Sequence, residues 1–461
     1  MAEDQQNVNE VDVSASPPLT KRQKIIFCGI AASYVFNLMS FSIIAPFFPA
    51  EAAKKGLSPT QVGFIFALFN LVNFLASPLF GKFLPVLGAK FVFLSGAWVA
   101  AGCNVLFGVL DEIEDTQTFM IFCFVVRAVE ACGSAASITA SMTITANAFP
   151  DNMAQMMGIL ESFSGIAFMV GPPLGGLFYS IGGYKLPFFA LGGISVATII
   201  FNIILLPSVG VGRAESGSLK NMFLIPAFYP TALAVIIGSA SLGFLDPTLS
   251  PHLLSFDLSA PLVAVSFLLM GGVYALTSPL WGYLADKKKN TRFMMVIGFY
   301  LSAISYLLLG PSPLLNLPKQ LWIVLFALSL AGLSIGCSLM PAFLDMFISA
   351  GWYGFSDDLS TQGVVSGLFN SFFSLGGFIG PLLGGYLVDR YDFSWASTVF
   401  AGANLSVMIL LCLFGVWEYR CGKGRRPPWV RFDDSSREDE RDPLLPNDVI
   451  SPAIPDKTVN M

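Results

Sequence analysis

One apolar stretch occurs twice in this chain, and each copy carries residues that an isolated membrane helix avoids. The copies run from Gly158 to Gly176 and from Gly367 to Gly385, and they align without a gap. Each contains a Gly-Pro step, Gly171-Pro172 in the first copy and Gly380-Pro381 in the second. Such helix breakers are tolerated in membrane helices that pack against other helices. The chain is therefore predicted to be a duplicated membrane bundle whose glycines allow helices to pack closely.

Composition and hydropathy support a membrane fold along the whole chain. Only 12% of the 461 residues are charged, whereas soluble domains have about 25% charged residues. A helix that spans a bilayer needs about 20 apolar residues, and about twelve such runs occur here. They lie at roughly 25–48, 60–84, 91–110, 118–148, 154–180, 186–206, 227–250, 260–284, 293–310, 319–347, 360–387 and 395–417. The predicted fold is an all-α membrane protein.

The predicted spans fall into two sets of six, separated by a polar segment. A second repeat supports two pseudo-symmetric halves, because the sequence from Ser77 to Gly81 resembles the sequence from Ser278 to Gly282. The predicted parts are an N-terminal tail (1–24), a first six-helix bundle (25–207), a linker (208–222), a second six-helix bundle (223–418) and a disordered tail (419–461).

The lysines and arginines predict the orientation in the membrane. Most of the 25 basic residues fall on one side if the spans alternate in direction, and this side also carries both termini. Basic loops remain in the cytoplasm, so both termini are predicted to be cytoplasmic. No basic face of the kind that binds nucleic acid is present, and the partners expected here are lipid and small molecules.

The polar C-terminal tail contains an acidic dileucine sequence. Glu440 is followed by Leu444 and Leu445, and this spacing resembles the sorting signal that adaptor proteins of endosomes and vesicles bind. The tail composition predicts disorder, which would leave the two leucines accessible. We therefore expect delivery to a vesicle or a lysosome-related compartment, with adaptor proteins as partners.

Few ionisable residues lie inside the predicted spans. An intramembrane charge costs several kcal/mol unless it faces a polar interior, so each of these residues is a candidate for function. They are Arg127, Glu130, Glu161, Asp246 and Asp345. Four acids against one base leave a surplus of negative charge. A carboxylate in such a site can be neutralised by a proton or by a bound cation, and competition between the two is a basis for exchange.

Depth in the membrane ranks these candidates. Glu130 and Glu161 lie nearest the predicted midplane, where transporters hold substrate between their repeats. Arg127 is three residues before Glu130 and can pair with it on one helix face, so a purely structural ion pair is the alternative interpretation. Asp345 lies near a span end, where the alternative is a solvated boundary residue.

Aromatic residues could complement these acids. Tyr34, Phe244 and Tyr274 lie within predicted spans, and aromatic rings attract cations to their faces. The chain has 43 phenylalanines, so the alternative for any one aromatic is a place in the core or facing lipid.

The inventory of chemical groups argues against an enzyme. There is no P-loop sequence for nucleotide binding, and a single histidine leaves no triad and no metal cluster. The seven cysteines are scattered and include no C-x-x-C pair. We expect no metal and no cofactor.

Three motifs resemble those of the major facilitator superfamily. Arg127 followed by Gly133 and small residues resembles the motif of its fourth span, and the run from Gly171 to Gly176 resembles the antiporter motif of its fifth span. The sequence from Gly282 to Asp286, followed by lysines, resembles its loop motif between spans two and three, kept here in the second half. The first-half copy of that motif has Pro85 in place of the acid. The resemblance implies a twelve-helix bundle with gating contacts at Asp286.

Further segments resemble the vesicular amine transporter family. These are the sequence around Pro46, the sequence around Asp246-Pro247 and the sequence from Leu160 to Gly165. The resemblance implies proton-driven uptake of organic cations into acidic vesicles. Asn37 and Asn370 stand where the vesicular monoamine transporters carry aspartates, which argues against a monoamine substrate.

The expected function is therefore secondary active antiport of protons against polyamines such as spermine and spermidine. Several positive charges on one substrate would match several buried acids. Glu130 and Glu161 are expected to bind cation and proton, with Asp246 and Asp345 as second sites. Two alternatives remain, namely transport of a monoamine or another organic cation, and a transport-silent scaffold whose tail is the active part.

Overall fold

The computed structural model describes residues 21–206, 219–258, 260–315 and 318–420, and all the regular elements in them are helices. The long helices of the first half are α1 (Lys21–Ser42), α3 (Pro59–Leu87), α4 (Ala89–Val109), α5 (Thr116–Ala148), α6 (Met153–Gly182) and α7 (Lys185–Leu205). Those of the second half are α9 (Phe228–Leu254), α10 (Ala260–Lys288), α11 (Thr291–Leu309), α12 (Leu321–Trp352), α13 (Leu359–Arg390) and α14 (Phe393–Arg420).

Twelve helices of the described chain are long and apolar enough to cross a membrane, which confirms the predicted all-α membrane fold. The short elements are α2 (Phe48–Lys54), α8 (Leu219–Met222) and two 3-10 turns, Leu110–Glu112 and Pro150–Asn152. Helix α1 begins at Lys21, inside the predicted N-terminal tail, and α8 lies inside the predicted linker. Glu440, Leu444 and Leu445 lie outside the described residues.

Local signals in the sequence set several helix ends. Ser58 and Gln61 form a capping box that starts α3, and the side chain of Asp115 accepts a hydrogen bond from the Thr118 amide at the start of α5. Such caps satisfy amides that have no partner within the helix. Gly88, with φ of +85°, separates α3 from α4. This left-handed backbone favours glycine, so the turn between the two spans is short.

The Gly-Pro motifs join the helices inside each half. A Cβ atom at Gly171 or Gly175 of α6 would collide with Ser42 or Ile43, at the end of α1 and just beyond it. A Cβ atom at Gly380 of α13 would likewise collide with the carbonyl oxygen of Ala240 in α9. Glycine permits this approach because it has no side chain. The two copies of the repeat therefore fix equivalent helix pairs.

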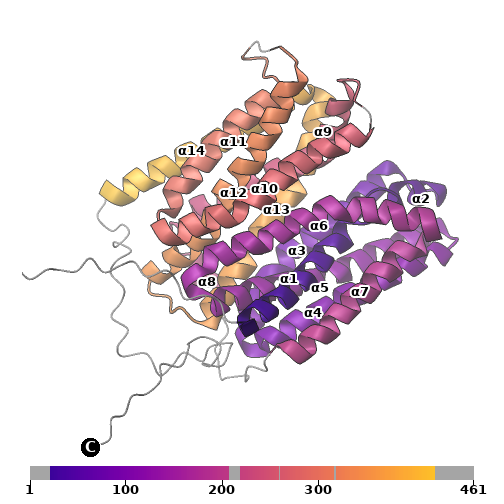
Figure 1. The fold of residues 1–461 in the computed structure, drawn as a ribbon, viewed down its shortest axis with the longest axis horizontal. Helices are drawn as coiled ribbons and strands as arrows, with labels where there is room; N and C mark the ends of the chain where they lie inside the picture. The colour runs from indigo at the N-terminus through magenta and orange to yellow at the C-terminus, as the bar shows by residue number, and fades with distance from the viewer. Residues whose placement is uncertain (1–20, 207–218, 259, 316–317, 421–461) are drawn as a thin grey trace, which may run out of the picture.

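The first glycine of each copy makes a different contact, between the two halves. A Cβ atom at Gly367 of α13 would lie 2.5 Å from the carbonyl oxygen of Ser77 in α3. Gly158 of α6 packs against the carbonyl oxygen of Ser278 in α10 in the same way. Ser77 and Ser278 are themselves equivalent in the sequence repeat. The halves thus meet along two pseudo-symmetric helix pairs, and Figure 1 shows α6 and α10 side by side at this boundary.

The contacts between halves lie from the middle of these helices to one end. Asn70 of α3 donates to the carbonyl oxygen of Gly377, and Ser162 of α6 donates to that of Ala275. Closer to the end that carries the first residue of α6, Asp286 accepts from backbone amides of that helix. This end of the boundary is therefore sealed, and it is the end predicted to face the cytoplasm.

Candidate functional site

Glu161 lies where three helices from both halves meet. Its carboxylate accepts hydrogen bonds from the Tyr34 hydroxyl of α1 (2.9 Å) and from the Ser164 hydroxyl (2.8 Å). A longer contact of 3.4 Å joins it to the Tyr274 hydroxyl of α10. Glu161 is 8% exposed and both tyrosines are buried. The carboxylate therefore has three hydroxyl partners and connects the two halves.

In the part of the chain that the structure describes, no basic residue neutralises the Glu161 carboxylate. Within the described residues, the ion pairs of the bundle involve other acids, and no lysine or arginine lies within ion-pair distance of Glu161. A buried charge without a partner is costly, so the carboxylate requires a proton or a cationic ligand. The site can therefore exchange one for the other, with aromatic rings available to a ligand cation.

Glu130 has a different environment, inside the first half. Its carboxylate pairs with the Arg127 guanidinium at 2.7 Å, and both residues are 1% exposed. Ser40 of α1 donates a hydrogen bond to the same carboxylate. The interpretation of a buried ion pair between Arg127 and Glu130 is confirmed. Arg127 and Ser40, the two partners of Glu130, both belong to the first half. Glu161, in contrast, contacts the second half through Tyr274.

Aromatic rings enclose the guanidinium of Arg127. It lies 5.9 Å from the ring centre of Phe41, 5.3 Å from that of Phe69 and 5.5 Å from that of Phe107. Cation–π attraction stabilises a positive charge at such sites. The positive charge of Arg127 is thus held by the rings as well as by Glu130.

Asp345 is completely buried, so the interpretation of a solvated boundary residue is wrong. Its carboxylate accepts from Thr231 of α9 (2.8 Å) and Thr291 of α11 (2.7 Å) and lies 3.5 Å from the Arg292 guanidinium. Arg292 also pairs with Glu418 of α14. This network joins four helices of the second half. Its contacts hold the Asp345 carboxylate in place.

Arg292 is a buried cation that the sequence pattern does not reveal. In the sequence, Arg292 follows the lysines that come after Asp286, and this position suggests a loop. In the structure, Arg292 lies at the start of α11 and only 8% of it is exposed. Its distance from Asp345 in the sequence gives no signal of their pairing. A second buried cation reduces the surplus of negative charge that the predicted spans contain.

The remaining predicted residues divide between exposed and packed positions. Asp246 is exposed on α9, one residue before Pro247. Phe244 is fully buried and stacks on Phe393 and Phe400 inside the second half, so the alternative of a place in the core is confirmed for this residue. An exposed carboxylate on a membrane helix is stable only where water reaches it.

Both asparagines are buried and hydrogen-bonded. The side-chain oxygen of Asn37 accepts from the Ser134 hydroxyl of α5 at 2.5 Å, inside the first half. Asn370 of α13 donates its amide to the Ser77 hydroxyl of α3 at 2.9 Å, across the boundary between halves. Asn370 therefore contributes to the contact that holds the halves together, whereas Asn37 does not.

Asp286 caps a helix of the opposite half. Its two carboxylate oxygens accept from the amides of Ala154 (3.0 Å) and Gln155 (2.7 Å) at the start of α6. A negative charge is favourable at a helix N-terminus. Pro85, its equivalent in the first half, has no carboxylate, and α13 is capped instead by its own Asp358. The seal between the halves is therefore asymmetric.

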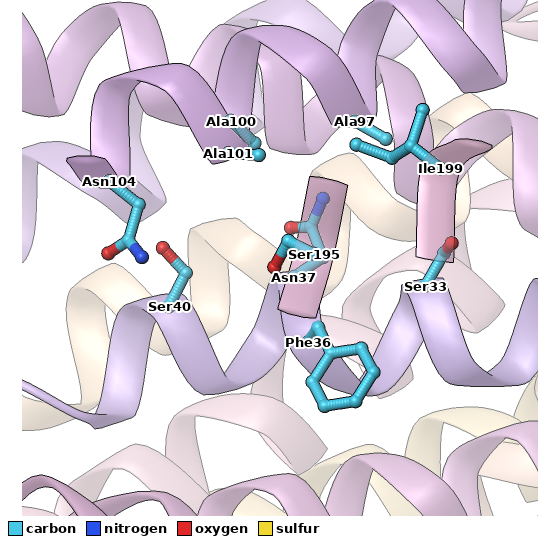
Figure 2. A pocket seen from close by; sticks show the side chains of 10 residues that line it. All are labelled: Ser33, Phe36, Asn37, Ser40, Ala97, Ala100, Ala101, Asn104, Ser195 and Ile199. Atoms are coloured by element: carbon cyan, nitrogen blue, oxygen red, sulfur yellow. The ribbon is translucent and has the colours of Figure 1, made fainter. Parts of the chain in front are cut away.

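A small cavity lies in the first half, between α1, α4 and α7 (Figure 2). The centre of a water molecule can occupy about 20 Å³ of it, which is enough for one water. Five polar residues line it, together with Phe36, Ile199 and three alanines. The polar residues are Ser33, Asn37, Ser40, Asn104 and Ser195.

Known proteins resemble the chain along most of its length. The MFS-type transporter SLC18B1 of Rattus norvegicus is 41% identical over 93% of this chain and 94% of its own, and that of Homo sapiens is 40% identical over the same shares. The vesicular acetylcholine transporter of Mus musculus is 24% identical over 86% of this chain and 73% of its own. These relatives confirm the resemblance to vesicular amine transporters.

Solved structures and family models agree with the fold. The crystal structure of the human organic anion transporter MFSD10 (TETRAN) has a TM-score of 0.65 at 16% identity, covering 85% of this chain and 100% of that one. A model of the Major Facilitator Superfamily matches residues 30–356 and 231–452. With twelve candidate membrane helices in two repeated halves, the chain belongs to the Major Facilitator Superfamily.

Proposed function

We propose that this protein is a secondary active transporter that exchanges protons for polyamines such as spermine and spermidine across a vesicle membrane. The observation that carries the proposal is the Glu161 carboxylate, which is buried between Tyr34 and Tyr274 and has no basic partner among the described residues. Its position between helices of both halves allows ligand binding to influence how the halves meet.

Exchange follows from the electrostatics of this site. A proton bound to Glu161 and an ammonium group beside it each neutralise the same buried charge, and binding of both leaves a surplus positive charge. The two ligands therefore compete. The Tyr34 and Tyr274 hydroxyls hold the carboxylate in place, and their rings provide faces for an alkylammonium group.

The distribution of acids fits a polyamine better than it fits a substrate with a single positive charge. Asp246, on the exposed side of α9, is another acid with no ion pair among the described residues. Glu130 and Asp345 are paired with arginines, so they are weaker candidates for ammonium binding. A chain of ammonium groups could contact Glu161 with one end and an acid such as Asp246 with another.

The seal between the halves supports alternating access. Gly367, Gly158 and Asp286 hold the halves together towards the end predicted to face the cytoplasm. In this proposal, substrate would enter or leave from the opposite side while these contacts are formed. Vesicle delivery through Glu440, Leu444 and Leu445 is part of the same proposal, because their spacing resembles a sorting signal.

A second candidate is transport of an organic cation with a single charge. A carboxylate flanked by two tyrosines is also a suitable site for a quaternary ammonium, and a relative at 24% identity is named a vesicular acetylcholine transporter. Thermal stability of the purified protein separates the candidates. Stabilisation by spermine favours a polyamine, stabilisation by acetylcholine alone favours the second candidate, and no effect of any cation favours a scaffold.

The decisive variant is Glu161→Gln in reconstituted vesicles. We expect spermidine uptake driven by a pH gradient to fall by about 100-fold or more, because an amide can neither bind the proton nor attract the cation. Glu114→Gln is the matched control, since Glu114 is exposed between α4 and α5 and the substitution removes one charge outside the bundle. Uptake that persists in Glu161→Gln would remove this residue from the mechanism.

A further inference from the structure

The Glu161 site has a pseudo-symmetric counterpart at the other contact between the halves. In the repeat of Gly158–Gly176, Glu161 aligns with Asn370 of α13. In the repeat that aligns α3 with α10, Tyr274 aligns with Asn73 of α3. The carboxylate and the tyrosine hydroxyl of one contact are therefore replaced by two amides at the other.

Hydrogen bonds show that the aligned positions are also equivalent in space. Ser162 of α6 donates to the carbonyl oxygen of Ala275 in α10 at 2.6 Å. Its repeat partner Ser371 of α13 donates to the carbonyl oxygen of Phe74 in α3 at 2.7 Å. Because each half has an even number of spans, both halves begin on the same side of the membrane, and equivalent residues lie at similar depth. The two amides therefore lie at about the depth of the carboxylate.

A chain of two hydrogen bonds orients the amide of Asn370. Its nitrogen donates to the Ser77 hydroxyl at 2.9 Å, and that hydroxyl donates to the backbone oxygen of Asn73 at 2.7 Å. The second bond uses the hydroxyl proton, so the atom of Asn370 that faces Ser77 must be a donor. The other branch of the Asn370 amide is therefore its oxygen, an acceptor that this chain of bonds does not use.

The amide of Asn73 has an unused acceptor as well. Its nitrogen donates to the backbone oxygen of Phe69 at 3.0 Å, and its side-chain oxygen is buried without a hydrogen-bond partner in the described part of the chain. By their spacing, Asn70, Asn73 and Ser77 lie on one face of α3, and Asn70 and Ser77 both bond to α13. The unused oxygen of Asn73 therefore belongs to the boundary between the halves.

This counterpart of the Glu161 site differs from it in charge. The repeat also aligns Tyr34 with Val235, which is fully buried, so the aligned positions supply two amide oxygens and no carboxylate. Amide oxygens accept hydrogen bonds from an ammonium group, and a buried acceptor that gains a donor is stabilised. Unlike a carboxylate, an amide does not take up a proton near neutral pH. These positions therefore suit an amine without adding a second site of competition with protons.

We propose that the side-chain oxygens of Asn73 and Asn370 form a second amine subsite, which holds one ammonium group of a polyamine while Glu161 holds another. The inference rests on the proposed function and makes its substrate more specific, because a linear cation with separated amines gains both subsites and a monoamine gains one. Both amides are at most 5% exposed, so the amine reaches them when α3 and α13 separate during alternating access. A further amine can still contact Asp246.

Two variants of the full-length protein test the subsite. Asn73→Leu keeps a branched side chain and removes the acceptor. Asn370→Asp keeps the shape and adds a negative charge, so it decides the test if Asn73→Leu does not fold.

Asn404→Leu is the matched control. Like Asn73, Asn404 is buried, donates to the carbonyl oxygen four residues before it, and has a side-chain oxygen without a partner among the described residues. Its amide also donates to Ser241 of α9, so it lies between two helices of the second half and away from the boundary. The substitution therefore reproduces the chemical change without touching the proposed subsite.

The measurement is the binding affinity of each protein in lipid nanodiscs for spermidine and for butylamine, which has a single amine. We expect Asn73→Leu to weaken spermidine binding about 10-fold or more, as is typical when a hydrogen bond to a charged group is lost. Butylamine binding should stay as in Asn404→Leu, because Glu161 alone holds a single amine. Asn370→Asp should strengthen binding of spermidine relative to butylamine.

Three results would overturn the second subsite. They are equal spermidine affinities in Asn73→Leu and Asn404→Leu, an equal loss for spermidine and butylamine in Asn73→Leu, and an unchanged ratio of the two affinities in Asn370→Asp. Spermidine uptake by the unmodified protein would still support the proposed function in each of these cases. If the unmodified protein neither binds nor transports spermidine, the proposed function is refuted and the second subsite with it.

Discussion

The contact between Gly367 and Ser77 predicts a substitution that opens the sealed end of the bundle. In Gly367→Ala, the new Cβ atom would lie 2.5 Å from the Ser77 carbonyl oxygen and 3.1 Å from the Gly81 Cα atom. Both are backbone atoms of α3 and cannot rotate away. Helices α3 and α13 would therefore have to separate for the sealed state to form.

The expected shift in the equilibrium between the sealed and the open state follows from the free-energy cost of overpacking. Inserting a methyl group into a tightly packed contact costs about 1–3 kcal/mol, and only the sealed state has this contact. Alanine also favours the helix over glycine by about 1 kcal/mol, but this gain is the same in both states and cancels. A shift of about 2 kcal/mol changes the ratio of the two states about 30-fold.

The assay is the distance between spin labels at Val86 of α3 and Lys288 of α10, which are exposed near the sealed end on opposite halves. We expect Gly367→Ala to move the distance distribution toward longer values. Gly377→Ala on the same helix is the control, because its Cβ atom would make ordinary contacts of 3.5 Å with Asn70. Distributions that are identical for Gly367→Ala and the unmodified protein would refute the reasoning, as would an equal shift in the control.

Two further predictions concern charged groups at the two ends. Asp286→Asn should weaken the same seal by about 1–2 kcal/mol, because the amide keeps one acceptor and loses the charge that favours the α6 N-terminus; an unchanged spin-label distance would contradict this. At the other end, burial raises the pKa of Glu51, but hydrogen bonds from Lys54 and Tyr179 lower it more, so the pKa lies below its usual 4.5. This stabilisation is complete above pH 4.5 and is lost as the pH falls through the lowered pKa. The difference in melting temperature between the unmodified protein and Glu51→Gln should therefore shrink on acidification, and a constant difference would argue against the Glu51 contacts.

Sequence alone determined the architecture and the short list of candidates. Twelve apolar runs and the repeat of Gly158–Gly176 in Gly367–Gly385 require a duplicated helical bundle, because lipid forces every span to satisfy its own backbone. Intramembrane acids stand out in such a sequence because each has a large cost. Glu161 and the pair of Arg127 with Glu130 can therefore be identified from the order of residues, and the pair follows from spacing on one helix.

The tertiary structure decided which acid faces which environment. Spacing along one helix says nothing about partners on other helices, so the sequence could not distinguish Glu130, enclosed with Arg127, from Glu161, which reaches Tyr274 in the opposite half. It also could not show that Arg292 folds back onto Asp345. Electrostatic partners are set by contacts between segments that are distant in the chain, and only the packed bundle brings those segments together.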